Sequence, residues 1–142
     1  MNIEIRRFEN KDRKALRQIY LKSRTQTFVW EKSEEFKLDD FDQATKEEHL
    51  LVAIHKDQPI GFISWWPPEN FIHNLFVDPQ FSQHGVGKAL LNACLAKLSR
   101  PISLKCLKRN EHAISFYQSQ GWMIESEGES KDGDYWLMIL DT

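Results

Sequence analysis

The stretch from Val77 to Leu91 constrains the fold more than any other part of the chain. It starts at the end of a strand-like apolar run, passes through a loop that holds Gly85 and Gly87, and continues with helical spacing. A loop that opens a helix points several backbone N–H groups at one spot, where the helix dipole adds positive potential. Glycine lets an anion approach because it has no Cβ. The stretch predicts a phosphate cradle, or, in the simpler alternative, only a tight turn.

Two nucleotide-binding motifs do not fit this loop. The P-loop pattern requires glycine where Ser82 stands and a hydroxyl residue where Ala89 stands. The dinucleotide pattern requires a third glycine, but that position is Leu90, and no βαβ unit follows. ATP and NAD are therefore disfavoured as ligands of the loop.

The rest of the chain alternates between strand and helix patterns, with no repeat or linker. The expected strands are Ile3–Phe8, Leu50–His55, Ile60–Trp66, Phe71–Val77, Ile102–Leu107, Trp122–Glu127 and Tyr135–Leu140. The expected helices are Lys11–Thr25, Gly85–Leu98 and Asn110–Gln120. The acidic stretch Glu31–Lys46 lacks periodicity and predicts either a short helix or a loop packed by its aromatic residues. The second to fourth strands should form an antiparallel meander, and the last two should close around a turn at Lys131–Asp134.

Length and composition narrow the class of protein. The chain has 142 residues, which predicts one domain spanning 1–142. A net charge of −2 argues against binding to nucleic-acid backbone. No apolar run approaches the roughly 20 residues of a membrane span, which predicts a cytoplasmic protein. Cys94 and Cys106 lie in apolar runs without metal-ligand spacing, so we expect buried free thiols and no metal site.

Two separated motifs resemble those of a known family. Asn74–Pro79 followed by Gly85–Leu91 resembles the acetyl-CoA motif of the GNAT superfamily of N-acyltransferases. Asn110–Tyr117 followed by Gly121 and Trp122 is similar to its second signature. The resemblance implies an α/β (α+β) fold in three layers. Its central sheet would be mixed, mostly antiparallel and twisted, with about seven strands, helices on both faces and a splay between strands 4 and 5.

The resemblance also implies where acetyl-CoA binds. The backbone amides of Gln83–Lys88 would hold the pyrophosphate, and the pantetheine would run beside Leu75–Val77 and meet Asn110. The residues implied in cofactor binding are Leu75, Phe76, Val77, Gln83, His84, Gly85, Val86, Gly87, Lys88, Asn110, Ala113 and Tyr117. One position departs from the family pattern, which has Gln or Arg where Ser82 stands; Gln83 is one residue later.

Acetyl transfer from a thioester to an amine needs a base for the amine, a donor for the developing oxyanion and an acid for the thiolate. Tyr117 shares a helix face with Asn110 and Ala113, and the resemblance makes it the acid. The alternative is a hydroxyl that only contacts water. His73 is the candidate base, or a structural imidazole, with Glu69 as a second candidate. The oxyanion donor would be a backbone N–H near Leu75.

The acceptor is an amine of a small molecule, a peptide end or a protein lysine. Trp30, Trp65 and Glu69 are candidates for its pocket, because an aromatic wall can hold an amine. Trp65 and Trp66 point to opposite faces of a strand, so at most one lines a pocket. The exposed edge strands of such a sheet can pair with a second copy of the chain, so a homodimer is an open alternative.

The leading hypothesis is therefore an N-acetyltransferase that moves the acetyl group directly from acetyl-CoA to a primary amine in a ternary complex. One alternative is an acyl-CoA-binding sensor module of the same fold without turnover. Its only support is the departure from the family pattern at Ser82. The other is a non-enzymatic interaction domain whose glycines are structural.

Overall fold

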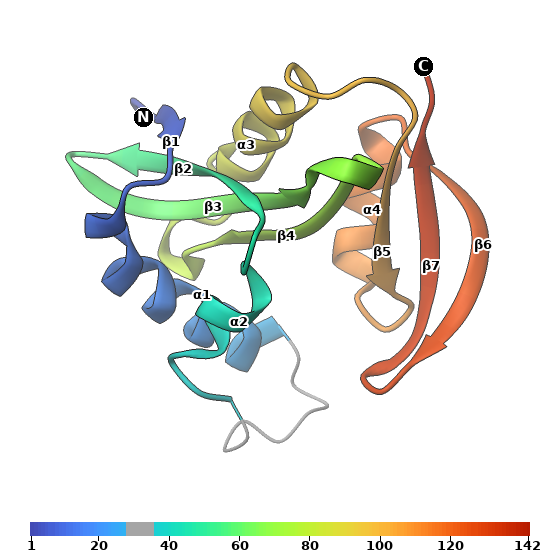
Figure 1. Ribbon diagram of the computed structural model, residues 1–142, viewed down its shortest axis with the longest axis horizontal. Helices are drawn as coiled ribbons and strands as arrows, with labels where there is room; N and C mark the ends of the chain where they lie inside the picture. The colour runs from blue at the N-terminus through green and yellow to red at the C-terminus, as the bar shows by residue number, and fades with distance from the viewer. Residues whose placement is uncertain (28–35) are drawn as a thin grey trace.

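A computed structural model describes residues 1–27 and 36–142. Its centre is one seven-stranded sheet in the order β1-β2-β3-β4-β5-β7-β6 (Figure 1). The strands are β1 Glu4–Arg7, β2 His49–His55, β3 Gln58–Trp66, β4 Phe71–Val77, β5 Ile102–Leu107, β6 Met123–Ser130 and β7 Gly133–Leu140. The helices are α1 Arg13–Thr27, α2 Asp40–Ala44, α3 Val86–Leu95 and α4 Glu111–Ser119, with 3-10 turns η1 Asn10–Asp12, η3 Pro67–Glu69 and η4 Pro79–Phe81.

The sheet separates in its middle. All neighbouring strands pair antiparallel except β4 and β5, which run parallel. That parallel pair holds only at Phe71 with Ser103 and at Ile72 with Leu104. Beyond Ile72 the two strands diverge, as Figure 1 shows. The predicted mixed sheet with a splay between its fourth and fifth strands is confirmed.

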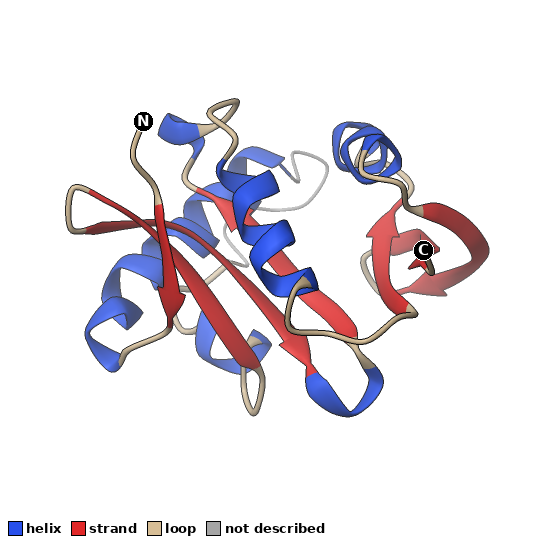
Figure 2. Cartoon of the chain, turned by 90° about the horizontal axis from the view of Figure 1, so that it is seen from above, coloured by secondary structure: helices blue, strands red, loops and turns tan. Residues whose placement is uncertain are grey.

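Helices cover both faces and give two cores. Figure 2 shows α1 and α3 on opposite sides of the sheet. The core under α3 and α4 contains Leu90 and Leu104, whereas the core under α1 and α2 contains Leu16 and Phe62. Successive side chains of a strand point to opposite faces, and β2, β3 and β4 each contribute to both cores. The fold therefore has the three layers that the resemblance implied.

Helix α1 is tied to the end of β4. The Ser23 hydroxyl donates to the carbonyl oxygen of Val77 at 3.0 Å, and Lys22 forms an ion pair with Asp78 at 3.0 Å. Asp78 also caps the short turn that follows, accepting from the backbone N–H of Gln80. These bonds fix the chain at the point where the glycine loop begins.

Several expected element bounds are corrected by the structure. The first helix starts at Arg13, because Asn10–Asp12 forms a 3-10 turn before it. Helix α3 ends at Leu95, three residues earlier than predicted. The last two strands are longer and close on a tighter turn before Gly133, whose φ of 128° suits glycine. The first strand is shorter than expected at both ends.

The stretch Glu31–Lys46 is only partly described. It contains the five-residue helix α2 in its described part. The two cysteines are free and buried, as predicted. No helix in the two described ranges is long and apolar enough to cross a membrane.

Candidate functional site

A cleft opens where β4 and β5 diverge. It consists of two adjoining cavities of about 330 Å³ and 280 Å³. Both are lined by Leu75, Val77, His112, Ala113 and Tyr117. The larger cavity extends to the glycine loop, and the smaller one extends to the middle of β4 and to β5. The two cavities therefore join the predicted phosphate cradle to the predicted acid and base.

The glycine loop presents free backbone donors to the larger cavity. Gln83 and Gly85 have left-handed φ values of 65° and 79°, and Gly85 is the N-cap of α3 without a side-chain cap. Among the described residues, no partner accepts from the backbone N–H groups of Gln83–Lys88. A Cβ added at Gly85 would meet nothing within 4 Å, so this position faces open space. Unpaired amides at a helix N-terminus fit a phosphate group.

Most of the residues expected to bind the cofactor line the cleft. The larger cavity is lined by nine of them: Leu75, Val77, Gln83, Gly85, Val86, Gly87, Lys88, Ala113 and Tyr117. Phe76 and Asn110 line the smaller one. His84 is exposed and lines neither cavity. Ser82 lies beside Gln83 at the larger cavity, so both residues at the departure from the family pattern border the cleft.

Asn110 positions helix α4. Its side-chain oxygen accepts from the backbone N–H of Ala113 at 3.3 Å, which makes Asn110 the N-cap of α4. The cap fixes the start of the helix, and the helical spacing then places Ala113 and Tyr117 on the face that lines the cleft.

Tyr117 is nine-tenths buried and has a hydroxyl without a partner in residues 1–27 and 36–142. Its ring makes an edge contact with Trp122 at 5.8 Å between ring centroids. Burial raises the pKa of its phenol well above the ordinary value, and the neighbouring thiols of Cys106 and Cys94 raise it further. The group therefore stays protonated at physiological pH and can donate a proton.

His73 lies at a bulge in β4. The register between β3 and β4 passes from Ser64 opposite Asn74 to Trp65 opposite Ile72, which leaves His73 without a paired residue. Bulges re-aim side chains and are common beside active sites. The His73 ring remains 46% exposed, and its Nδ1 lies 2.8 Å from a carboxylate oxygen of Glu48.

The Glu48 carboxylate determines the state of this imidazole. The hydrogen bond to Glu48 raises the pKa of His73 above its ordinary value, and burial works in the opposite direction. The nearby backbone of Ala44 also raises that pKa, whereas the charge of Lys105 lowers it. Because Nδ1 faces the carboxylate, Nε2 is the nitrogen left for exchange of a proton with a substrate.

Sequence analysis missed the residues that support His73. The Glu48 side chain is only 8% exposed, and its second oxygen accepts from the Ser64 hydroxyl at 2.7 Å. Asn74 donates to the same hydroxyl at 2.8 Å and to the backbone oxygen of Ala44 at 3.3 Å. A serine inside an apolar strand was the one available signal, because a buried hydroxyl needs a partner.

The candidates for the acceptor pocket do not gather in the cleft. Trp65 is 4% exposed and belongs to the core under α3. It lines neither cavity, because the strand pleat and the bulge opposite it direct the ring to the α3 face. Glu69 lies exposed on η3 and also lines neither cavity. Trp30 lies outside the described residues.

A three-layer fold with a free-amide cradle and a cleft between two diverging strands defines the class of acyl-CoA-dependent transferases. The model of the acetyltransferase (GNAT) family matches residues 13–122. The chain therefore belongs to the GNAT family of N-acetyltransferases and is an acyltransferase. This membership favours catalysis over the sensor module and over the interaction domain.

Individual relatives agree with this assignment. The chain is 28% identical over 135 residues to the peptidyl-lysine N-acetyltransferase YjaB of Escherichia coli, covering 93% of this chain and 90% of that protein. The solution structure of apo YjaB from E. coli has a TM-score of 0.80 at 23% identity, covering 98% and 97%. The PaiA N-acetyltransferase of Thermoplasma acidophilum, solved with coenzyme A, has a TM-score of 0.80 at 22% identity over both whole chains.

Proposed function

We propose that this protein transfers an acetyl group from acetyl-CoA directly to a primary amine. The observation that carries the proposal is the cleft itself, which joins a cradle of unpaired amides, a buried neutral phenol and a carboxylate-bound imidazole. We also propose that residues 1–142 form one catalytic domain, which the match of one family model over 13–122 supports.

The donor end of the cleft fits acetyl-CoA. The amides of Gln83–Lys88 would hold the pyrophosphate, with Lys88 as an added cation at the rim. In the described part of the chain, the edge of β4 that faces β5 has no strand partner beyond Ile72. The backbone groups of Leu75–Val77 on that edge are therefore available to the pantetheine amides. Acetyl-CoA supplies the activated thioester carbonyl; no group of the protein forms a covalent bond in this scheme.

The protein's own groups move the protons. Nε2 of His73 takes a proton from the acceptor ammonium, directly or through a water molecule, so that the nitrogen lone pair can form the new C–N bond. A backbone N–H near Leu75 stabilises the negative charge that develops on the carbonyl oxygen. Tyr117 gives its phenolic proton to the sulfur as the C–S bond breaks. The nitrogen of the new amide releases its second proton, which returns to the Tyr117 phenolate through water. His73 keeps the proton from the amine and later loses it to solvent.

A lysine in a peptide is the acceptor we propose to test first. The support is the name of the E. coli relative, a peptidyl-lysine N-acetyltransferase with 28% identity over nearly the full chain. A second structural neighbour, at 18% identity, is the E. coli ribosomal-protein-S18-alanine N-acetyltransferase, so a peptide N-terminus belongs in the same panel.

The deciding measurement is release of coenzyme A in a thiol assay with lysine peptides, N-terminal alanine peptides and small amines. Tyr117→Phe should lower kcat by about 100-fold or more, because general acid catalysis contributes at least that much, and should leave acetyl-CoA binding intact. Tyr135→Phe changes a tyrosine outside the cleft and should have no effect. Unchanged turnover in Tyr117→Phe would show that Tyr117 is not the general acid.

A further inference from the structure

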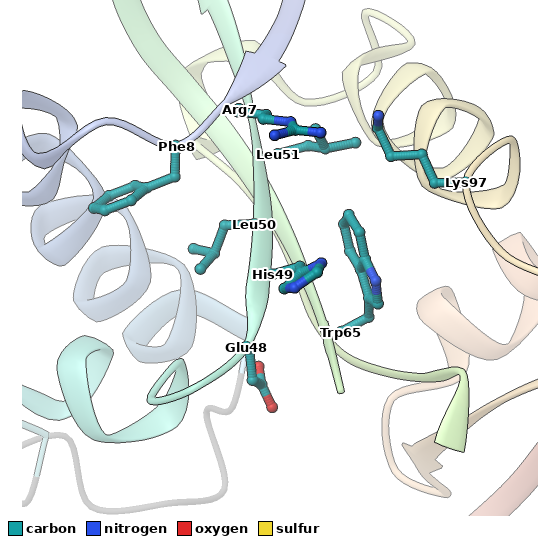
Figure 3. A pocket seen from close by; sticks show the side chains of 8 residues that line it. All are labelled: Arg7, Phe8, Glu48, His49, Leu50, Leu51, Trp65 and Lys97. Carbon is teal, nitrogen blue, oxygen red and sulfur yellow. The ribbon is translucent and has the colours of Figure 1, made fainter. Parts of the chain in front are cut away.

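A separate pocket of about 300 Å³ lies beside the start of β2 and shares no lining residue with the cleft. It is bordered by the end of β1, the beginning of β2, Trp65 of β3 and the segment after α3. Figure 3 shows it from close by. Neither the glycine loop nor His73 borders this pocket, and Glu48, which does line it, directs its carboxylate to His73.

Two cationic side chains face one another across the mouth of this pocket. Arg7 is the last residue of β1, and Lys97 follows the end of α3. Figure 3 shows the two head groups extending toward each other from opposite sides. Neither side chain has an ion pair or a side-chain hydrogen bond with a residue of the described chain, whereas the adjacent Arg6 is bound to Asp12 by two bonds of 2.8 Å.

The acid in the lining does not neutralise these cations. The Glu48 carboxylate points away from Arg7 and Lys97 in Figure 3. Both of its oxygens are already engaged, one by His73 at 2.8 Å and one by Ser64 at 2.7 Å. Within residues 1–27 and 36–142, the two cations at the mouth of the pocket therefore have no carboxylate paired with them.

The floor of the pocket is aromatic and apolar. His49 and Trp65 are paired across β2 and β3, with their rings 5.7 Å apart in an edge-on arrangement. Figure 3 shows both rings below the two cations, with Leu51 beside the Arg7 head group. The His49 ring is exposed, whereas Trp65 is 4% exposed, so a flat apolar group would pack mainly on His49 while its charge meets the rim.

We propose that this pocket binds a small organic anion. A carboxylate or phosphate group lies between the Arg7 guanidinium and the Lys97 ammonium, and an aromatic or apolar body packs on the exposed His49 ring. A pair of charge-assisted hydrogen bonds is the strongest kind of contact that such a rim can make. The cavity volume lies at the small end of ligand pockets, which favours a single-ring ligand over a nucleotide.

The test is calorimetric titration of the full chain with phenyl phosphate, benzoate, benzamide and inorganic phosphate. The two ring-bearing anions should bind, and the neutral benzamide and the ringless phosphate should bind at least about tenfold more weakly. The relative strength of phenyl phosphate and benzoate tells which acidic group the rim selects. If neither anion binds at millimolar concentration, or if inorganic phosphate equals phenyl phosphate, the proposal fails.

Matched variants locate the binding. The double variant Arg7→Gln/Lys97→Gln should weaken binding of both anions by about tenfold or more, because each lost charge-assisted bond is worth that much. Lys14→Gln/Lys46→Gln removes the same charge elsewhere and should bind like the wild type. If the double variant has a lowered melting temperature, the single variant Lys97→Gln replaces it in the titration, because Lys97 lies outside the helices and strands. Binding that survives the loss of both rim cations, for example at the glycine loop, overturns the proposal.

Discussion

The state of His73 depends on a single carboxylate. Glu48 raises the pKa of the imidazole through a 2.8 Å contact, so His73 holds its proton to higher pH than an ordinary histidine. A base works only in its neutral form, so turnover should rise as pH increases through that raised pKa. In this scheme Glu48 is a positioning residue: it fixes the ring and its tautomer but does not touch the amine.

Glu48→Gln tests this role, because glutamine keeps an oxygen acceptor but removes the charge. We expect the acidic limb of the kcat/KM profile to move to lower pH, since the charge that favours imidazolium is lost. The pH–rate profile is the measurement, and the neighbouring exposed Glu47→Gln is the control. A limb that stays in place in Glu48→Gln would mean that His73 is not the group that titrates.

At the scale of elements, the turn into α3 depends on two glycines with different backbone requirements. Gly85 has a φ of 79°, which costs an L-residue about 1–2 kcal/mol. Gly87 has no such φ, and a Cβ there would lie 3.9 Å from Phe116 and Val77, an ordinary contact. Gly85→Ala should therefore lower the free energy of unfolding, whereas Gly87→Ala should leave it unchanged or raise it by up to about 1 kcal/mol. Urea unfolding of the two variants compares them; equal destabilisation would contradict this account.

The junction between β1 and α1 depends on a buried carboxylate. Asp12 is 2% exposed and accepts two bonds of 2.8 Å from Arg6 and one of 2.9 Å from the backbone of Glu9. We expect Asp12→Asn to lower the free energy of unfolding by about 2 kcal/mol at neutral pH, since the Arg6 guanidinium loses its buried carboxylate and keeps only the more exposed Glu9 at 3.1 Å. The exposed Asp141→Asn should have little effect.

The effect of Asp12→Asn should depend on pH in a defined direction. The bonds to Arg6 lower the pKa of Asp12 below its ordinary value of 3.8. The stabilisation is therefore complete above that ordinary value and is lost as the pH falls through the lowered pKa. Denaturant titrations in acid should show wild type and variant converging. A gap that stays constant into acid would assign the loss to packing.

At the scale of the whole molecule, the cleft divides the sheet into two parts that meet along a short parallel pair. Leu75 and Val77 line it from β4, and Ala113 and Tyr117 line it from α4. A ligand in the cleft contacts both parts, so acetyl-CoA should raise the melting temperature. At about 100 times its dissociation constant it should add about 2.7 kcal/mol, or roughly 10 °C for a chain of this size.

Differential scanning calorimetry with acetyl-CoA measures this effect. S-acetyl-N-acetylcysteamine carries the thioester without the pyrophosphate, so it should give a much smaller shift at the same concentration. An equal shift would show that the backbone amides of the glycine loop do not contribute to binding. No shift with acetyl-CoA would show that the cofactor does not bind in the cleft.

The local parts of this protein follow from the sequence. The alternating strands, the glycine turn after Val77 and the Asn110 cap all depend on residues within one helical turn or one strand of each other. The spacing from Asn110 to Tyr117 likewise placed the phenol on the face of α4 that lines the cleft. Such features are determined by backbone preferences that short segments carry with them, so they could be predicted without knowledge of the rest of the chain.

The tertiary structure decided the features that join distant segments. Glu48 meets His73 across 25 residues, and the bulge that turns His73 out of register is visible only against β3. The burial of Trp65 depends in the same way on the face that its strand presents to α3. The local sequence pattern does not reveal which distant residue accepts a hydrogen bond or which helix covers a given strand face. The energy of such a contact depends on a geometry that only the assembled sheet supplies. The sequence alone thus determines the order of the elements and the glycine loop before α3. The folded molecule determines that Glu48 is the partner of His73 and what shape the pockets have.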